Sequence, residues 1–549
     1  MRASQTPTAC PASTGVAITA VAVANWTTLA YDILGRLTQR NEPEYITTWS
    51  FDKLANGTAC NKGIGKLCEV VTSNGVNRKI SYDSFGRAVN TRTNITSGPS
   101  FASAMAYDNV TGRAMSQIYP TGLQVNYNYT AKGFMEKLTL GTAATISPLP
   151  TTPGGTPGAG ATLAVGSVLW QAVRVNASGK TEQQTYGNGV TNTAVFDGLT
   201  GRTTALTAGA GTSTNVLNQT YAWDSINNLT MRADNIADGQ GVTLSETFAY
   251  DALNRTTSYT VSGPSAIPNS SRTVNLTYNV LGSILYKSDV GVYGYSASGA
   301  GAVRPHALQS VTATSATNYT YDLNGNLISA SAGSYRTIAY TSFNQPDSNT
   351  GVSGPGIAAN GATAVRDTWS YDENHSRIKQ VHTVTGGALA GTRTTWYLHP
   401  DAAGGLSFES EINAPTVVSA ANPAVTSNRH YLSAGGQVFG VLVSNGALPT
   451  LTAAATAPPA ISTIALRKVE YWHKDHLGSL TATTDHAGAV TARYAYDPFG
   501  KRRYINGAYD AFGALVIDWN SAVSSGTARG FTGHEMLDDV GLIHMNGRL

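Results

Sequence analysis

The sequence predicts an all-β protein, built as a long and mostly antiparallel ribbon of hairpins. Three observations lead to this fold class: a turn motif recurs at hairpin spacing, the segments between the motifs alternate in polarity, and the composition disfavours helix. The 549 residues include 57 glycines and 27 tyrosines but only 12 phenylalanines, which is typical of a turn-rich chain. Charged residues make up 13% of the chain, too few for a coiled coil or a helical bundle.

A turn motif of the form Tyr-Asp-x-x-Gly-Arg recurs along the chain. Neighbouring copies lie a hairpin apart, because 25 residues separate Tyr82 from Tyr107 and 27 separate Phe196 from Trp223. The turn residues to which we assign a structural role are Tyr31, Asp32, Gly35, Arg36, Tyr82, Asp83, Gly86, Arg87, Tyr107, Asp108, Gly112, Arg113, Phe196, Asp197, Gly201, Arg202, Tyr321, Asp322, Gly325, Tyr496, Asp497 and Gly500. Looser copies start at Phe51, Trp223, Tyr250, Tyr278 and Tyr371.

The residue types of one copy suit a tight turn. An Asp at its first position accepts hydrogen bonds from backbone N–H groups two residues further on, and a Gly at its fourth position tolerates the positive φ that closes the turn with a bulge. The aromatic residue before the turn and the apolar residue after Arg, such as Tyr31 and Leu37, then face each other across two strands. Each copy is therefore predicted to be a hairpin turn.

The segments between the turns alternate apolar and polar residues, as in residues 123–129 and 273–278. This period of two places the apolar side chains on one face of a strand. A single hairpin cannot bury such a face, so the copies are expected to stack or to join edge to edge in a continuous sheet.

The repeat resembles the RHS/YD repeat of bacterial rearrangement-hotspot proteins, insecticidal toxin-complex C subunits and the YD-shell of animal teneurins. The resemblance covers the chain from about Tyr31 onward and is most specific near the end, where four ordered blocks are similar to the RHS repeat-associated core. These blocks lie at 471–479, 494–500, 531–535 and 541–549. The resemblance implies a strand ribbon that spirals into a hollow shell.

The repeats and the changes in composition divide the chain into four parts. We expect an N-terminal segment (1–30), a repeat array (31–413) with a Gly/Pro-rich insertion at 142–166, an Ala/Pro/Ser/Thr-rich insertion or loop with strands (414–465), and the core-like block (466–549).

In the family the shell encloses a toxin or another C-terminal domain. The resemblance therefore implies a non-enzymatic scaffold that encapsulates or presents a C-terminal toxin polypeptide or a separately encoded cargo, and a component of a secretion apparatus as a further partner. It also implies a secreted or cell-surface protein that is cytoplasmic before export. The expected plug and toxin segments do not follow residue 549, which suggests a truncated or partial copy.

Many family members cleave themselves with a pair of aspartates in repeated Asp-Pro-x-Gly-Leu motifs, where two close carboxylates share a proton. The nearest string here, at 538–542, lacks Pro. We therefore interpret Asp538 and Asp539 as solvated carboxylates of a turn and expect no autoprotease.

Five histidines, His473, His476, His486, His534 and His544, lie in the last part of the chain and raise the hypothesis of a metal site. In a strand, residues three apart point to opposite faces, so His473 and His476 suit packing better than chelation. The common nucleophile-elbow, phosphate-loop and zinc-protease motifs do not occur. We expect no cofactor and no metal.

Two other functions stay open. A surface adhesin or carbohydrate binder would use exposed Tyr and Trp rings to stack on sugars, although the scattered tryptophans, Trp49, Trp170, Trp223, Trp369, Trp396 and Trp472, suit core anchoring better. A glycosidase would need two placed carboxylates, but a large share of the aspartates sits in the repeat turns.

Charge and hydropathy limit the partners further. The formal net charge of +3 gives no support to nucleic acid or an anionic membrane as ligand. No run of 18 apolar residues predicts a membrane span. The apolar segment 15–26 is read either as a signal-peptide core or as an edge strand, and the second reading fits its flanks better.

The three cysteines supply neither a disulfide framework nor four zinc ligands. Cys60 and Cys68 flank a Gly-rich stretch that could bring them together. A local disulfide and two separate thiols therefore both remain open.

Overall fold

The computed structural model describes residues 26–147, 160–237, 241–267, 270–300, 302–313, 316–331, 336–351, 361–398, 407–419, 422–452, 456–508 and 528–545. Within these ranges the regular secondary structure is almost entirely strand, and 35 of the described strands form one continuous sheet. The predicted all-β class is confirmed. Cys10, nearly all of segment 15–26 and residues 546–549 of the last core-like block lie outside the described residues.

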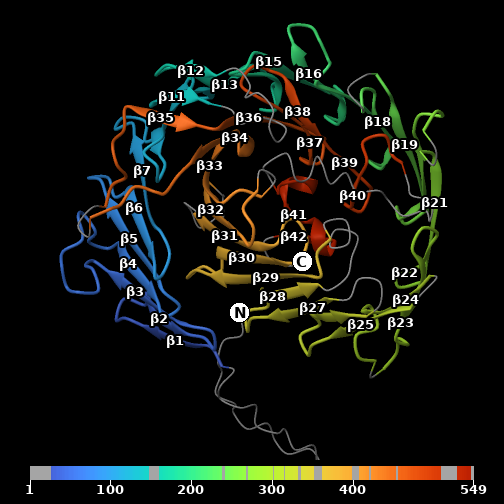
Figure 1. Cartoon of the computed structure of the whole chain (residues 1–549), viewed down its shortest axis with the longest axis horizontal. Coiled ribbons are helices and arrows are strands. Elements are labelled where there is room, and N and C mark those ends of the chain that lie inside the picture. Colours follow the sequence, from blue (N-terminus) through green and yellow to red (C-terminus); the bar gives the residue numbers. More distant parts are fainter. Residues whose placement is uncertain are drawn as a thin grey trace, which may run out of the picture.

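The ribbon first runs once around a ring (Figure 1). The strands of this first round are β1 (Thr28–Tyr31), β2 (Leu37–Asn41), β3 (Ile46–Phe51), β4 (Leu67–Thr72), β5 (Val76–Tyr82), β6 (Ala88–Ile95), β7 (Ser100–Tyr107), β8 (Ala114–Ile118), β9 (Gln124–Tyr129), β10 (Met135–Leu140), β13 (Val168–Val175), β14 (Thr181–Tyr186), β15 (Val190–Phe196), β16 (Thr203–Ala210), β17 (Leu217–Trp223), β18 (Leu229–Asp234), β19 (Leu244–Tyr250), β20 (Thr256–Ser262), β21 (Arg272–Tyr278), β22 (Ile284–Lys287), β23 (Gly291–Tyr295), β24 (Leu308–Thr312), β25 (Ala316–Tyr321), β26 (Leu327–Ala330), β27 (Arg336–Tyr340) and β28 (Pro346–Gly351).

The ribbon then continues into a second round that crosses the middle of the ring in Figure 1. Its strands are β29 (Ala364–Tyr371), β30 (Arg377–Thr385), β31 (Gly391–Leu398), β32 (Phe408–Pro415), β33 (Val425–Ala434), β34 (Gln437–Asn445), β36 (Lys468–Lys474), β37 (Leu480–Thr484) and β38 (Val490–Arg493). A C-terminal segment lies inside the ring and holds β39 (Ala495–Tyr496), β40 (Arg502–Arg503), the 3-10 turns η2 (Phe531–Gly533) and η3 (Asp538–Val540), β41 (Glu535–Leu537) and β42 (Leu542–His544).

Strand direction alternates along the whole ribbon, so successive connections lie at opposite edges. One edge, which we call the repeat rim, carries the turns at 32–36, 83–87, 108–113, 197–202 and 322–326. The other edge, the opposite rim, carries tighter turns such as 73–75, 120–122 and 187–189. The repeat motif therefore marks a single edge of the shell.

The two rounds pack on each other over the largest core cluster. First-round residues such as Phe101 and Tyr186 meet second-round residues, with ring centroids 5.9 Å apart for Phe101 and Phe408 and 5.3 Å for Tyr186 and Tyr471. The hydrophobic face that one hairpin leaves open is thus covered by the next round of the spiral.

Two stretches of biased composition contribute to this core. Strand β11 (Ala143–Ile146) pairs with β12 (Ala161–Leu163) and, in parallel, with β35 (Thr463–Leu466), so the stretches around 142–166 and 414–465 meet in a three-stranded sheet. Strands β33 and β34 also fall in the second stretch. The proposed domain boundaries themselves stay a prediction.

A far-UV circular dichroism spectrum checks the architecture. We expect a β-dominated spectrum with helix far below the third that is usual in globular proteins. A helical content above about a fifth would contradict the ribbon, because hairpin strands connected by short turns leave no room for helices.

Candidate functional site

The repeat turns share one hydrogen-bond arrangement. In the turn 83–87, Oδ1 of Asp83 accepts the N–H groups of Phe85 (2.9 Å) and Arg87 (3.0 Å), while Nε of Arg87 donates to Oδ2 (2.6 Å). Gly86 has a φ of 75°, in the left-handed region. Partial desolvation raises the pKa of Asp83, but the hydrogen bonds from Arg87 and Phe85 outweigh it, so the net shift is downward.

The other repeat residues adopt the same geometry with small changes. In the longer turns, the Thr111 and Thr200 hydroxyls donate to Asp108 and Asp197, and Asn326 replaces Arg beside Asp322. The glycines with positive φ in the assigned turns are Gly35, Gly112, Gly201, Gly325 and Gly500. The aromatic residues pair across the strands as Tyr31 with Leu37, Tyr82 with Ala88, Tyr107 with Ala114, Phe196 with Thr203, Tyr321 with Leu327 and Tyr496 with Arg502.

The repeat arginines have a second role that the sequence analysis missed. The guanidinium of Arg36 binds Asp52 Oδ2 at 2.8 Å and lies 4.5 Å from the ring centroid of Phe51. Arg87 likewise donates to the backbone carbonyl of Asp108 at 2.9 Å. Each arginine therefore connects its own turn to the next repeat. The available signal was the aromatic-Asp pair that follows Arg36, Arg87 and Arg202 after 15, 20 and 21 residues. Arg202 binds Asp224 O in the same way, and Arg113 lies over Tyr129.

The last assigned repeat differs because it is buried. Tyr496 and Asp497 are buried, and the Tyr496 hydroxyl donates to Leu480 O at 3.0 Å. Burial raises the pKa of Asp497 above its usual value. Gly500 faces Phe531, so this turn packs against the C-terminal segment instead of forming the free edge.

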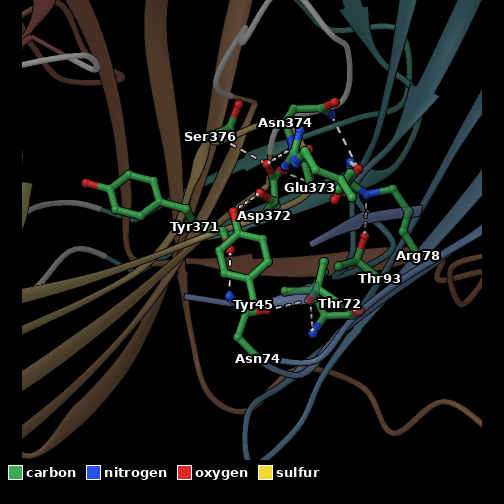
Figure 2. Close-up of polar contacts among 12 residues, drawn as sticks. Tyr45, Thr72, Asn74, Arg78, Thr93, Tyr371, Asp372, Glu373, Asn374 and Ser376 are labelled. Carbon is green, nitrogen blue, oxygen red and sulfur yellow. Dashed lines mark hydrogen bonds and ion pairs between the residues drawn. The ribbon is translucent and has the colours of Figure 1, made fainter. Parts of the chain in front are cut away.

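A seam joins the two rounds where the turn 372–376 meets the beginning of the ribbon (Figure 2). The buried guanidinium of Arg78 on β5 forms ion pairs with Glu373 and with Asp372 Oδ2, the latter at 3.1 Å. The Tyr45 hydroxyl donates to Asp372 O at 2.8 Å. Burial raises the pKa of Glu373 even though Arg78 lies against it. The seam thus joins residues about 300 positions apart in the sequence.

Tyrosines of the opposite rim repeat this contact around the shell. The hydroxyls of Tyr119 and Tyr186 donate to Tyr431 O (2.7 Å) and Trp472 O (3.0 Å), both in the second round. Because strand carbonyls of the second round accept these bonds, the two rounds are held by hydrogen bonds as well as by the core.

Two buried histidines lie in the same interface. His430 is hydrogen-bonded to Thr121 Oγ1 at 2.7 Å and to Leu442 O, and His473 to Asn192 Oδ1 at 2.7 Å. Burial lowers the pKa of His430 to about 4 and that of His473 to about 3. Both imidazoles are therefore neutral near pH 7.

A charged inner wall lies where the C-terminal segment covers β30–β33. It consists of Arg377, Glu409, Glu411 and Arg429 on these strands, together with Arg529 and Glu535. Arg529 Nη2 lies 2.6 Å from Glu409 Oε1. Burial raises the pKa of Glu409, but the charges of Arg529 and Arg429 outweigh it and the net shift is downward. Removing one partner would leave a buried, uncompensated charge.

A cavity of about 330 Å³ lies beside the charged inner wall. It is lined by strands β29–β33 on one side and by residues 528–529, 535–538 and 540 on the other. Its size falls at the lower end of the range of small-ligand sites.

Three of the four remaining C-terminal histidines have a packing or hydrogen-bond partner. His476 lies in the turn after β36, 4.4 Å from the Tyr221 ring centroid, and His534 is hydrogen-bonded to Thr532 Oγ1. His544 packs on Trp369 at 5.5 Å, and His486 lies in the turn between β37 and β38. Across the described ranges, no group of three or more His, Cys, Asp or Glu side chains could hold a metal ion.

The interpretation of Asp538 as a solvated carboxylate is wrong. Its side chain is only 15% exposed, and its Oδ2 lies 3.2 Å from Arg502 Nε, because η3 packs against the inside of the shell. The Asp539 side chain lies outside the described residues.

The cysteine alternatives are resolved in favour of the disulfide. Cys60, in the connection between β3 and β4, is bonded to Cys68 on β4, with their Cα atoms 5.9 Å apart. A Cβ at Gly63 would lie 2.3 Å from Cys60 Sγ, so this loop has room only for glycine there.

Comparison with solved structures identifies similar shells. The TcdB2-TccC3 crystal structure matches with a TM-score of 0.61 at 14% identity, over 96% of this chain and 26% of that chain. The Photorhabdus luminescens Tc holotoxin pore matches with a TM-score of 0.61 at 14% identity, over 95% of this chain and 25% of that one. The TcdB2-TccC3-Cdc42 structure matches with a TM-score of 0.59 at 14% identity, over 96% and 26%.

This likeness shows the fold. The chain has an RHS-like shell fold and spans about a quarter of the length of the solved structures it matches. No family model matches the sequence, and no curated protein matches it by sequence. No helix among the described residues is long and apolar enough to cross a membrane.

Two substitutions test the structural role of the repeat turn. Asp83→Ala removes the acceptor of two backbone N–H groups and should lower the melting temperature. Gly86→Val should cost about 1–3 kcal/mol, because a β-branched residue at positive φ is strained. Thermal melting of both variants measures this. An unchanged melting temperature for Asp83→Ala together with lost binding of a ligand would instead make Asp83 a contact residue.

The two buried histidines between the rounds, His430 and His473, predict a pH dependence. A histidine whose folded pKa is depressed stabilises the fold above its unfolded pKa, and this contribution is lost as the pH falls toward the folded value. For His430 the window runs from about pH 6.5 to about 4, a loss of about 3 kcal/mol. Urea unfolding at several pH values measures the free energy of unfolding. Between about pH 6.5 and 4 this free energy should fall less for His430→Gln than for the wild type, and as much for the turn variant His486→Gln as for the wild type. An equal fall in the wild type and both variants would contradict this expectation.

Proposed function

We propose that the protein is a non-enzymatic RHS/YD-repeat scaffold that encapsulates or presents a toxin or another polypeptide in secretion or intercellular competition. In this proposal the C-terminal blocks correspond to the RHS repeat-associated core, and the protein acts at the cell surface or after secretion. The observation that carries it is the closed spiral: a continuous ribbon whose second round is sealed onto its first.

Steric enclosure explains how such a fold could work without a catalytic residue. A wall of paired strands excludes proteases and other soluble proteins from whatever lies inside, and it has few free strand edges. The neighbours with the same fold include TcdB2-TccC3 structures and a Tc holotoxin pore, which supports a toxin-encapsulating scaffold in general.

A carbohydrate-binding surface receives less support. Trp170, Trp369, Trp396 and Trp472 are buried, so their faces are not available for stacking on sugars. Trp49 and Trp223 are partly exposed, and Trp223 donates its indole N–H to Thr203 O.

Protease protection tests the proposal. An unfolded reporter polypeptide fused after Leu549 should survive trypsin concentrations that digest the free reporter, because the shell encloses it. Digestion of the fused and free reporter at the same rate would contradict encapsulation.

A seam variant sharpens this experiment. Arg78→Ala leaves Asp372 and Glu373 buried without their cation and should open the seam, so that protection falls. Tyr119→Phe removes a single bond between the rounds and should weaken protection less. Arg174→Ala, which breaks an exposed ion pair with Glu182, is the matched control and should leave protection intact.

A further inference from the structure

One carboxylate in the lining of the cavity lacks the partner that its neighbours have. The Glu409, Glu411, Glu535 and Asp538 side chains each form an ion pair with an arginine. Asp367, on β29, is fully buried and forms no ion pair with an arginine or lysine among the described residues. Its charge is thus the one acidic charge of the described lining without a guanidinium.

The hydrogen bonds of Asp367 use only half of its carboxylate. Oδ1 accepts from Gln380 Nε2 at 3.0 Å and is bonded to His382 Nδ1 at 2.8 Å. Oδ2 is buried and has no hydrogen-bond partner within the part of the chain that the structure describes. An unsatisfied carboxylate oxygen is costly in a buried setting, so this atom needs a donor.

A second polar side chain lies next to Asp367. Asn349, on β28, stands directly opposite Asp367 in the strand register and is fully buried. Neither its Oδ1 nor its Nδ2 has a hydrogen-bond partner among the described residues. Asn349 does not line the cavity, so a ligand in the cavity meets the Asp367 carboxylate and not the Asn349 amide.

A buried carboxylate with one unused oxygen suits a cation with several N–H groups. A guanidinium offers a positive charge and several donors, whereas water offers two donors and no charge. The cavity is also large enough for a side chain.

We propose that this cavity, the Asp367 pocket, binds the guanidinium of an arginine side chain belonging to the enclosed polypeptide. The inference rests on the proposed function for the source of the arginine, but the chemistry of the pocket does not depend on it. Asp367 supplies the charge and the unused acceptor oxygen, and Gln380 and His382 hold the carboxylate in place.

Arg393 is a charged residue beside the pocket whose removal should change the affinity for a cation. It lies across from His382 on β31, is exposed, and forms no ion pair among the described residues. A guanidinium entering the pocket would meet the like charge of Arg393, which repels it. Removing this charge should therefore strengthen binding.

Binding of blocked amino acids to the full chain tests the proposal by calorimetry. N-acetyl-arginine amide should bind saturably, and the neutral isostere N-acetyl-citrulline amide at least tenfold more weakly. Asp367→Asn should abolish this preference, Arg393→Gln should increase the affinity for the arginine derivative, and Glu182→Gln, which removes an acid away from the cavity, should change nothing. Circular dichroism and thermal melting establish that each variant is folded.

The outcomes separate the sources of the ligand. Binding of a blocked Gly-Gly-Arg-Gly-Gly peptide supports an arginine carried on a polypeptide, whereas binding of free propylguanidinium alone would overturn that source. Equal binding of the arginine and citrulline derivatives, or no saturable binding of either, means that only water occupies the pocket and overturns the proposal. The binding assay contains no cargo, so its failure leaves the protease-protection result unaffected. Failure of the protease-protection experiment likewise leaves the binding result unaffected.

Discussion

The shell depends on the hydrogen bonds that each repeat carboxylate accepts from the backbone of its own turn. In the turn of Asp83, two N–H groups and one guanidinium converge on a single side chain, so the reversal of the chain and the register of the flanking strands are set locally. Arg87 then reaches the next turn. Repetition of this unit places the first-round turns, such as 32–36, 83–87 and 197–202, on one rim.

Closure of the spiral relies on a different kind of contact. Polar side chains of the opposite rim, such as Tyr45 and Tyr119, bind backbone carbonyls of the second round, and Arg78 is buried with two carboxylates. Buried ion pairs contribute little net stability, but they penalise every arrangement in which one partner is left alone. The seam and the charged inner wall therefore specify how the rounds stack more than they strengthen the stack.

Sequence reasoning succeeded where the interaction is local. The turn carboxylates, the positive-φ glycines and the cross-strand pair of Tyr31 and Leu37 all involve residues within a few positions of each other. It failed where the partner is distant. Asp538 looked solvated because nothing nearby in the sequence indicates that Arg502 lies against it. The sequence analysis did not single out Asp367, because its neighbours in the fold are not its neighbours in the sequence.

The sequence by itself determined the all-β class, the hairpin repeat and its turn chemistry, because these follow from the conformational preferences of a few adjacent residues. Only the tertiary structure decided which carboxylates are buried, which histidines are held neutral and where the two rounds meet. Those properties arise from contacts such as Arg78 with Asp372, 294 positions apart. The energy of such a contact depends on desolvation, and desolvation depends on what the rest of the spiral places over it.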